Sequence, residues 1–507
     1  MGSGSEDSQR EAKQLPTGRL ARTARVGGLV TGQGVRWAST RAANRVRSPE
    51  RAAAAERERT TALVNELVDQ LGRMRGAAMK VGQMISMVEF DGLPEEQERE
   101  LRERLATLRD GVPPVPFSKL QKLLREELGG PLARSFAEFD EQAFAAASIG
   151  QVHRATTLDG HDVVVKVQYP GIAEAVDTDL RNAMLLVPLL RRLAPGLDGR
   201  ALASELRERI TEELDYELEA QNQRRIERLM RGHPLIHVPH VYTELSTRRV
   251  LVSEYVDGER FEAVRLLGEQ QRDRYAETVF RFFFGLLYRD RIALGDPHPG
   301  NYLRRADGRV SFLDFGLLRE VSGARVAAEA RIAMAVRTGD ADELKQALTA
   351  GGYLPPARAA AVDAELALRL MRRATSWYAI AGRHRFAEGE HGGDPHAVLA
   401  EDEPPAATHA AAAEHAPPQR EGPGAAAAID AQQQEARRAR VREQVNQFTV
   451  PAEAVLIRRM HGVVAAVMQS LRAGADWGAI AGEYLHGEPP ATEQGELEAE
   501  FLAARRA

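Results

Sequence analysis

The chain has 507 residues, no cysteine, 28% charged side chains and a formal net charge of −5. These values exclude disulfides and cysteine-ligated metals, and they provide no global basic field that would attract nucleic acid. The length allows about two to four structural units.

Residues 1–50 form a basic segment without hydrophobic periodicity. Between Ala12 and Ser48 there are seven arginines, one lysine and no acidic residue. An organellar targeting sequence, an arm that lies on anionic lipid and a disordered tail all have this composition. We predict a disordered tail and keep contact with an anionic membrane surface as a further expectation. The sequence contains no stretch of about 18 uncharged apolar residues, so it predicts no membrane-spanning helix.

Residues 51–130 follow a helical period. In the stretch MKVGQMISM, Lys80 and Gln83 are three residues apart and therefore share one helix face. Gly82 lies between them and allows another group to approach closely, although glycine weakens a helix. An amphipathic helix with buried methionines explains the same pattern without a function.

From about Phe136 the period changes to that of β-strands. The run AFAAASIGQVHRATTL, the turn Asp159-Gly160 and the run VVVKVQY predict a hairpin that carries Lys166. Protein kinases combine such a strand lysine with a glycine-rich turn over the ATP phosphates. The corresponding turn here consists of Ala145, Ala146, Ala147 and Ser148. An exposed edge-strand lysine is the plain alternative.

A lysine within an apolar strand needs an anion nearby. We expect phosphates and one glutamate of the helical segment TEELDYELEAQN, residues 211–222. Within it, Glu213 and Asp215 stand closest to a specific pattern. Downstream, the stretch LVSEYVDG has the form of a kinase hinge, so backbone groups at Glu254 and Val256 would bind the adenine edge.

The strongest signal is the pair GDPHPGN and LDFG. Asp296 and Asn301 are separated by four residues, and Asp314 follows thirteen residues after Asn301. Phosphoryl transfer needs a carboxylate near the attacking oxygen and oxygen ligands that hold Mg²⁺ against the phosphates. The spacing matches the catalytic loop and the metal-binding loop of protein kinases, joined by a short hairpin.

The remaining sequence predicts helices to about residue 380, a low-complexity segment at 385–430 and helices from 431 to the end. Proline, glycine, alanine and histidine dominate the low-complexity segment, which we interpret as a flexible loop or linker.

These motifs together resemble the UbiB/AarF family of atypical protein-kinase-like proteins, some of which are linked to coenzyme Q biosynthesis. Lys80-Val81-Gly82-Gln83 resembles the K-x-G-Q signature of the family, and the alanine turn resembles its alanine-rich loop. Glu213-Leu214-Asp215 matches E-x-D, and the segment from Asp296 to Asn301 matches D-P-H-P-G-N. The sequence before Asp296 departs from the family pattern, because it reads Ala-Leu-Gly where many relatives have Phe-His-Ala.

The resemblance implies an α+β, bilobal, protein-kinase-like fold with a β-rich N-lobe, a helical C-lobe and an N-terminal helical extension. The expected divisions are 1–50, a basic segment; 51–130, the K-x-G-Q extension; 131–258, the N-lobe with a helical insertion; 259–384, the C-lobe; 385–430, a linker; and 431–507, C-terminal helices. The implied nucleotide-binding residues are Ala145, Ala146, Ala147, Ser148, Lys166, Glu213, Glu254 and Val256.

The implied catalytic residues are Asp296 and Lys166. The implied Mg²⁺ ligands are Asn301 and Asp314. Lys80, Gly82, Gln83 and Asp215 would regulate the site, because the K-x-G-Q helix covers it in the family and blocks protein substrates. The expected ligands are ATP or ADP with Mg²⁺ and a lipid or isoprenoid small molecule. We also expect a cytoplasmic protein that lies peripherally at the inner face of a membrane. It would form a homodimer or join a biosynthetic complex.

Three functions remain open at this stage. The first is a Mg²⁺-dependent ATPase or small-molecule kinase that supports isoprenoid quinone or other lipid metabolism. The second is a nucleotide-responsive scaffold with little catalysis. The third is a phosphotransferase of the aminoglycoside or choline kinase type, which also carries the DPHPGN-like and DFG-like strings but lacks the K-x-G-Q helix.

Overall fold

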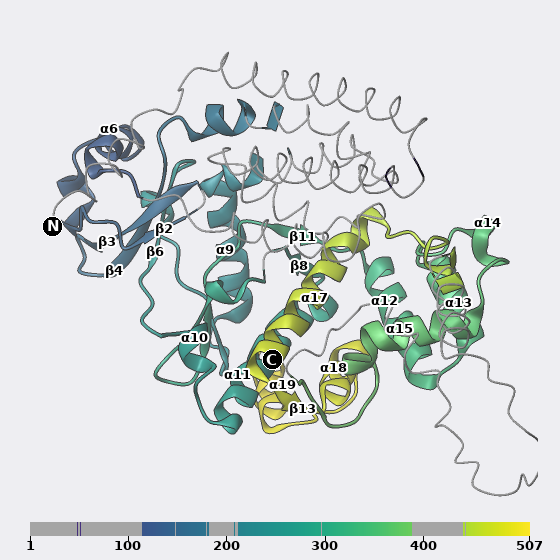
Figure 1. Ribbon diagram of the computed structural model, residues 1–507. Coiled ribbons are helices and arrows are strands. Elements are labelled where there is room, and N and C mark those ends of the chain that lie inside the picture. Colours follow the sequence, from purple (N-terminus) through teal and green to yellow (C-terminus); the bar gives the residue numbers. More distant parts are fainter. Residues whose placement is uncertain are drawn as a thin grey trace, which may run out of the picture. The chain divides into compact units, whose positions relative to one another are not determined.

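The computed structural model describes residues 48, 51, 114–147, 149–178, 180–181, 207, 211–295, 297–387, 440–441 and 443–506. By its internal contacts the chain divides into two compact units (Figure 1). The first comprises the described residues up to 221 together with 240–255. The second comprises residues 222–239 and the described residues from 256 onwards.

The first unit contains an antiparallel sheet. Its strands are β1 (Phe136–Phe139), β3 (Gly150–Thr157), β4 (Asp162–Gln168) and β6 (Val250–Glu254), in that order, with β2 (Ala145–Ala146) paired to β3. The register places Val152 opposite Lys166 and Lys166 opposite Leu251. The expected hairpin on either side of Asp159-Gly160 is therefore confirmed.

Helix α6 (Phe117–Glu127) covers one face of this sheet. Leu120, Leu123 and Leu124 recur at helical spacing and pack against the alternating valines of β4. Because side chains alternate across a strand, burying Val163, Val165 and Val167 on this face turns Lys166 to the opposite one.

The second unit is mainly helical. Its helices are α10 (Phe261–Val264), α11 (Glu269–Phe284), the π-helix η3 (Gly285–Arg289), α12 (Gly323–Thr338), α13 (Ala341–Ala350), α14 (Pro356–Ala359), α15 (Ala364–Ala379), α17 (Ala452–Leu471), α18 (Trp477–Leu485) and α19 (Glu493–Arg506). Helix α9 (Tyr216–Met230) begins in the first unit and ends in the second.

Short strands connect these helices. A four-stranded sheet has the order β5 (Ile236–His237), β10 (Val310–Phe312), β9 (Tyr302–Arg304) and β7 (Glu259–Arg260). Two further pairs are β8 (Ile292–Leu294) with β11 (Leu318–Glu320), and β12 (His384–Arg385) with β13 (Gly474–Ala475). The hairpin of β9 and β10 was expected from the sequence and is confirmed.

The core of the second unit is centred on α11, whose four phenylalanines between 280 and 284 are almost fully buried. Arg281 lies among them with 0% of its surface exposed. Its guanidinium contacts Glu277 on the same helix, Glu483 on α18 and Glu498 on α19, at 2.8 to 3.2 Å. These ion pairs link the C-terminal helices α18 and α19 to α11.

One segment differs from the expected division. Residues 222–239, which were expected in the N-lobe, belong to the second unit. The reason is pairing: β5 lies parallel to β10, with Ile236 opposite Val310.

Several expectations lie outside the described residues, namely the basic segment, the K-x-G-Q residues Lys80, Gly82 and Gln83, and almost all of the segment 385–430. None of the helices in the described ranges is both long enough and apolar enough to cross a membrane.

Candidate functional site

Lys166 forms a two-pronged ion pair in the first unit. Its Nζ lies 2.8 Å from both carboxylate oxygens of Glu219 on α9. Only 25% of the lysine side chain and 5% of the glutamate side chain are exposed. In protein kinases a strand lysine and a helix glutamate form such a pair and hold the ammonium against the nucleotide phosphates. The expected segment, 211–222, therefore provides the partner.

The segment that contains Glu213 and Asp215 precedes α9 and shapes its start. The Asp215 carboxylate accepts the backbone N–H of Leu218 at 3.1 Å, which is an N-cap contact. Gln168, at the end of β4, donates to the backbone carbonyls of Leu214 and Arg248. These bonds join the strand of Lys166 to the beginning of α9, so they set the position of Glu219.

Tyr216 packs behind the ion pair. Its ring is fully buried, and Lys166 Nζ lies 4.7 Å from the ring centroid, so the ammonium is held by a cation–π contact as well. Close by, a Cβ on Gly150 would lie 2.2 Å from the carbonyl oxygen of Val167. Only glycine fits at this position, where β3 passes the end of β4.

The alanine turn is closed on itself. Ala145 pairs with Val152, and Ala146 pairs with Gln151. The N–H of Ala147 donates to the carbonyl of Gly150 at 2.8 Å. That N–H is engaged within the turn, whereas glycine-rich turns direct their N–H groups at phosphates. Ser148 lies outside the described residues.

The expected hinge contains a boundary between the two units along the sequence, because Tyr255 belongs to the first unit and Val256 to the second. On its first side, the N–H of Glu254 donates to the carbonyl of His240 at 2.8 Å, and the N–H of Tyr255 donates to that of Asp162 at 3.0 Å. On its second side, Val256 is buried. Binding of adenine by Glu254 and Val256 stays a prediction.

In the second unit, the residues of DPHPGN build a tight turn. His298 Nδ1 accepts the N–H of Gly300 at 3.0 Å, and the Tyr302 hydroxyl donates to the carbonyl of Pro297. The N–H of Leu313 then donates to the carbonyl of Asn301 at 3.0 Å, which joins this turn to the DFG segment. Asp296 itself lies outside the described residues.

Asn301 and Asp314 lie side by side, with 3.4 Å between Asn301 Nδ2 and Asp314 Oδ2. The other Asp314 oxygen accepts the N–H of Gly316 at 2.9 Å, which fixes the carboxylate. An amide oxygen and a carboxylate are hard ligands of the kind that Mg²⁺ takes together with phosphate oxygens and water. The two residues therefore fit a Mg²⁺ ion that is shared with a nucleotide.

Gly295 explains the departure before Asp296. A Cβ at this position would lie 2.0 Å from Leu317 Cδ2, the side chain that follows DFG. The N–H of Gly295 donates to the carbonyl of Leu317 at 2.8 Å, so the two segments touch closely. A glycine here accommodates Leu317, and the loop can approach the DFG segment without a methyl group between them.

The C-terminal part of α9 contacts the DFG segment within the second unit. Asn222 Nδ2 donates to the carbonyl of Phe315 at 3.0 Å, and Arg225 lies 2.6 Å from Glu320. Asn222 does not stand out in the sequence, although it lies three residues after Glu219 and therefore close to it on the helix surface.

The candidate residues thus form one group in each unit: Lys166 with Glu219 in the first, and Asn301 with Asp314 in the second. The glutamate that pairs with Lys166 is Glu219 and not one of the two acidic residues that the E-x-D pattern favoured. Burial distinguishes Glu219, because it shares a buried stripe of α9 with Tyr216, Gln223 and Ile226, whereas the sequence alone does not single it out among the acidic residues of the segment.

Comparison with known proteins agrees with this geometry. Residues 107–348 match the ABC1 atypical kinase-like domain. The chain is 32% identical to the mitochondrial atypical kinase COQ8B of Rattus norvegicus over 67% of its own length and 64% of that protein. It is 28% identical to the mitochondrial atypical kinase COQ8 of Saccharomyces cerevisiae, over 61% of each chain.

The chain belongs to the UbiB/AarF family of atypical kinase-like proteins.

A solved structure supports the fold of this UbiB/AarF chain over most of its length. The structure of Rv3197 with erythromycin, from Mycobacterium tuberculosis, has a TM-score of 0.56 and 28% identity, and the match covers 87% of this chain and 98% of that one. The expected α+β, bilobal, kinase-like fold is confirmed. The chain spans less than two thirds of the length of each curated relative named above.

Proposed function

We propose that this family member binds ATP with Mg²⁺ and either hydrolyses it or transfers its terminal phosphoryl group to a small acceptor. The pairing of Lys166 with Glu219 carries the proposal, because it reproduces the kinase arrangement in a largely buried setting. The Lys166 ammonium would hold the phosphates, and Glu219 with Tyr216 would keep it in place. ADP would bind through the same contacts.

In the second unit, Asp296 would orient the attacking oxygen and receive its proton. Asn301 and Asp314 would hold the metal, which would neutralise charge on the phosphates. The bond from Gly316 to Asp314 keeps one carboxylate oxygen fixed and leaves the other beside Asn301. The hinge backbone at Glu254 and Val256 would receive the adenine.

The acceptor we propose is water or a small lipid-like molecule and not a protein. One point supports this choice, namely the resemblance of the K-x-G-Q segment to a helix that blocks protein substrates. Through the same resemblance we propose a role in isoprenoid quinone or other membrane lipid metabolism. The basic composition of residues 1–50 supports peripheral contact with anionic lipid. A homodimer or a biosynthetic complex is part of the same proposal and rests on the resemblance alone.

The closed alanine turn at Ala147 favours one alternative, a nucleotide-responsive scaffold. A turn that uses its own N–H group offers fewer donors to the phosphates, and donors to a transferred phosphoryl group are what accelerate its transfer. The scaffold would bind nucleotide through Lys166 and release it unchanged.

The experiment is a ³¹P NMR analysis of ATP incubated with the full chain and Mg²⁺. One series contains anionic liposomes with a short isoprenoid alcohol, and a second omits both. We expect ADP with inorganic phosphate or with a phosphate ester, formed faster with liposomes. Unchanged ATP in the presence of measured nucleotide binding would replace this proposal with the scaffold. An ester formed equally well on aminoglycosides or choline would favour the third class of function.

A further inference from the structure

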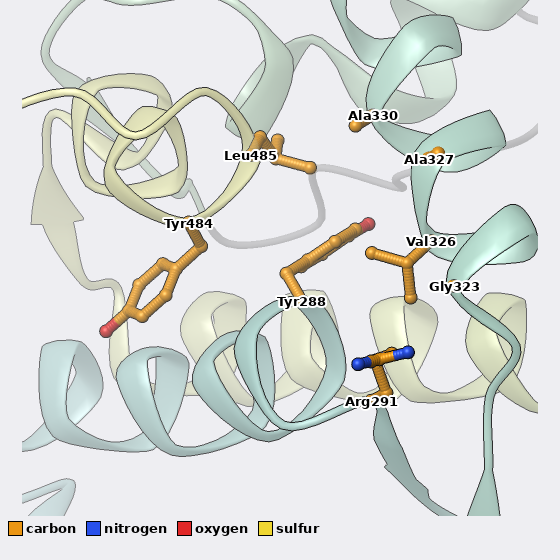
Figure 2. Close-up of a pocket in the computed structure, with 8 residues that line it drawn as sticks. All are labelled: Tyr288, Arg291, Gly323, Val326, Ala327, Ala330, Tyr484 and Leu485. Atoms are coloured by element: carbon orange, nitrogen blue, oxygen red, sulfur yellow. The ribbon is translucent and has the colours of Figure 1, made fainter.

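The second unit contains a pocket away from the DFG segment. It has a volume of about 340 Å³ and lies between the π-helix η3, the first turns of α12 and the end of α18 (Figure 2). Ligand pockets usually span about 300–1,000 Å³, so this one suits a small molecule. Gly323, Ala327 and Ala330 line it from one face of α12, and their small side chains leave the space open.

Two tyrosines, Tyr288 and Tyr484, are among the lining residues. The hydroxyl of Tyr288 lies 3.2 Å from His461 Nε2, and the hydroxyl of Tyr484 donates to Glu498. Neither partner lines the pocket. Figure 2 shows the Tyr484 hydroxyl directed away from Val326 and Ala327. Both hydroxyl groups are already bonded, so the apolar surface that the lining offers comes from the Tyr288 ring, Val326 and the alanines of α12.

Arg291 is the charged residue of the pocket. Figure 2 shows its guanidinium beside Val326, at the edge of the apolar wall. Among the described residues, no carboxylate or carbonyl pairs with this guanidinium, although Arg289, two positions earlier, is bonded to Asp290 and Glu498. The Arg291 side chain is exposed. Its five donors are therefore available to an anion.

Arg291 also has an unusual backbone conformation. Its φ is +58°, a left-handed conformation that costs a non-glycine residue free energy. It follows directly on the π-helix and Asp290, and π-turns occur often at functional sites. The carbonyl of Arg291 accepts the N–H of Val321 at 2.8 Å, which locks this conformation. The fold thus fixes an arginine at the pocket where a glycine would be less strained.

We propose that this pocket binds a small amphipathic anion. Its apolar body would lie between Tyr288 and the alanines of α12, and its carboxylate or phosphate would pair with Arg291. Both head groups make two-pronged bonds to guanidinium. The pocket lies entirely in the second unit, and its proposed ligand does not depend on nucleotide binding.

Isothermal titration calorimetry of the full chain, without nucleotide, tests the proposal. The probes are octanoate, octyl phosphate and, as a neutral match, octanol. The variants are Arg291→Gly, which removes the guanidinium and relieves the backbone, and Ala327→Phe, which fills the pocket but keeps the charge. Arg472→Gly is the matched control, because Arg472 is the other described non-glycine residue with a positive φ, +49°, and lies outside the pocket.

We expect octanoate or octyl phosphate to bind with one site per chain, and octanol to bind about tenfold more weakly because it lacks a charge. Arg291→Gly and Ala327→Phe should each weaken the anion by about tenfold or more, whereas Arg472→Gly should leave it unchanged. The stronger of the two anions identifies the head group. Equal affinity of the wild type and both pocket variants, equal loss in Arg472→Gly, or no saturable binding of either anion would overturn the proposal. Thermal melting of each variant separates loss of the site from loss of the fold.

Discussion

Replacing Lys166 with methionine is expected to lower the affinity for MgATP by about 10- to 100-fold, the range for a lost charge-assisted hydrogen bond. Its Nζ is the cation that Glu219 holds on the face of the sheet opposite α6. Glu219→Gln should cause a smaller loss, because the ammonium remains but one of its two-pronged contacts weakens. Competition against a fluorescent ATP analogue measures both constants.

Lys122→Met is the control for this pair of variants. Lys122 lies on α6 in the same unit, with 87% of its side chain exposed and a 3.7 Å pair to Glu126. Exposed pairs of this kind contribute little, so nucleotide affinity should not change. If Lys166→Met bound MgATP as tightly as Lys122→Met while remaining folded, Lys166 would have no part in nucleotide binding.

Replacing Arg281 with methionine is expected to cost about 3–5 kcal/mol of unfolding free energy, the cost of breaking a buried ion pair. Methionine matches the length of the arginine stem but leaves three acidic side chains, Glu277, Glu483 and Glu498, without their shared cation. The C-terminal helices α18 and α19 should detach first, because these carboxylates attach them to α11. Urea denaturation followed by tryptophan fluorescence measures the loss, since Trp477 starts α18.

Acid should weaken the same cluster in the wild type. Burial alone would raise the pKa of the Glu498 carboxyl, but His233, whose Nε2 lies 3.8 Å away, the hydrogen bond from Tyr484 and the charges of Arg289 and Arg281 lower that pKa to about 2. The pKa of an unfolded glutamate is about 4.3. A carboxylate with a lowered pKa stabilises the fold above the unfolded value, so this stabilisation should disappear between about pH 4.3 and pH 2.

Arg274→Met provides the matched comparison for Arg281→Met. Arg274 also lies on α11 and also pairs with α19, at 3.0 Å from Glu493, but both side chains are more than half exposed. Its removal should cost at most about 1 kcal/mol. Equal losses in the two variants would show that the buried cluster has no special weight in holding the C-terminal helices.

Much of the fold was predictable because local patterns determined it. The valines of β4 alternate around Lys166, and the turn Asp159-Gly160 sets the hairpin register, so the strand and the face of the lysine followed from the sequence. The hairpin between Asn301 and Asp314 followed in the same way from the turn at Gly308, which has a positive φ.

Other features depended on contacts that no local pattern encodes. The choice of Glu219 within an acidic segment required knowing where α9 begins, and Asp215 caps that start. The assignment of residues 222–239 required the pairing of β5 with β10, about 70 residues away in sequence. Helix α19 lies within the helical range expected at 431–507, but the π-helical form of residues 285–289 carries no distinctive sequence pattern, because tertiary packing stabilises it.

The central claim is that the chain performs Mg²⁺-dependent chemistry on ATP at Asp314, and the direct measurement is ATP turnover by Asp314→Asn. The matched control is Asp307→Asn in the same hairpin, where the Asp307 carboxyl, with its pKa lowered to about 2, pairs with Arg309 outside the site. We predict that Asp314→Asn lowers Mg²⁺-dependent turnover by about 100-fold or more, whereas Asp307→Asn retains wild-type turnover. Equal turnover in the wild type and Asp314→Asn, or none in the wild type at any Mg²⁺ concentration, would contradict the account.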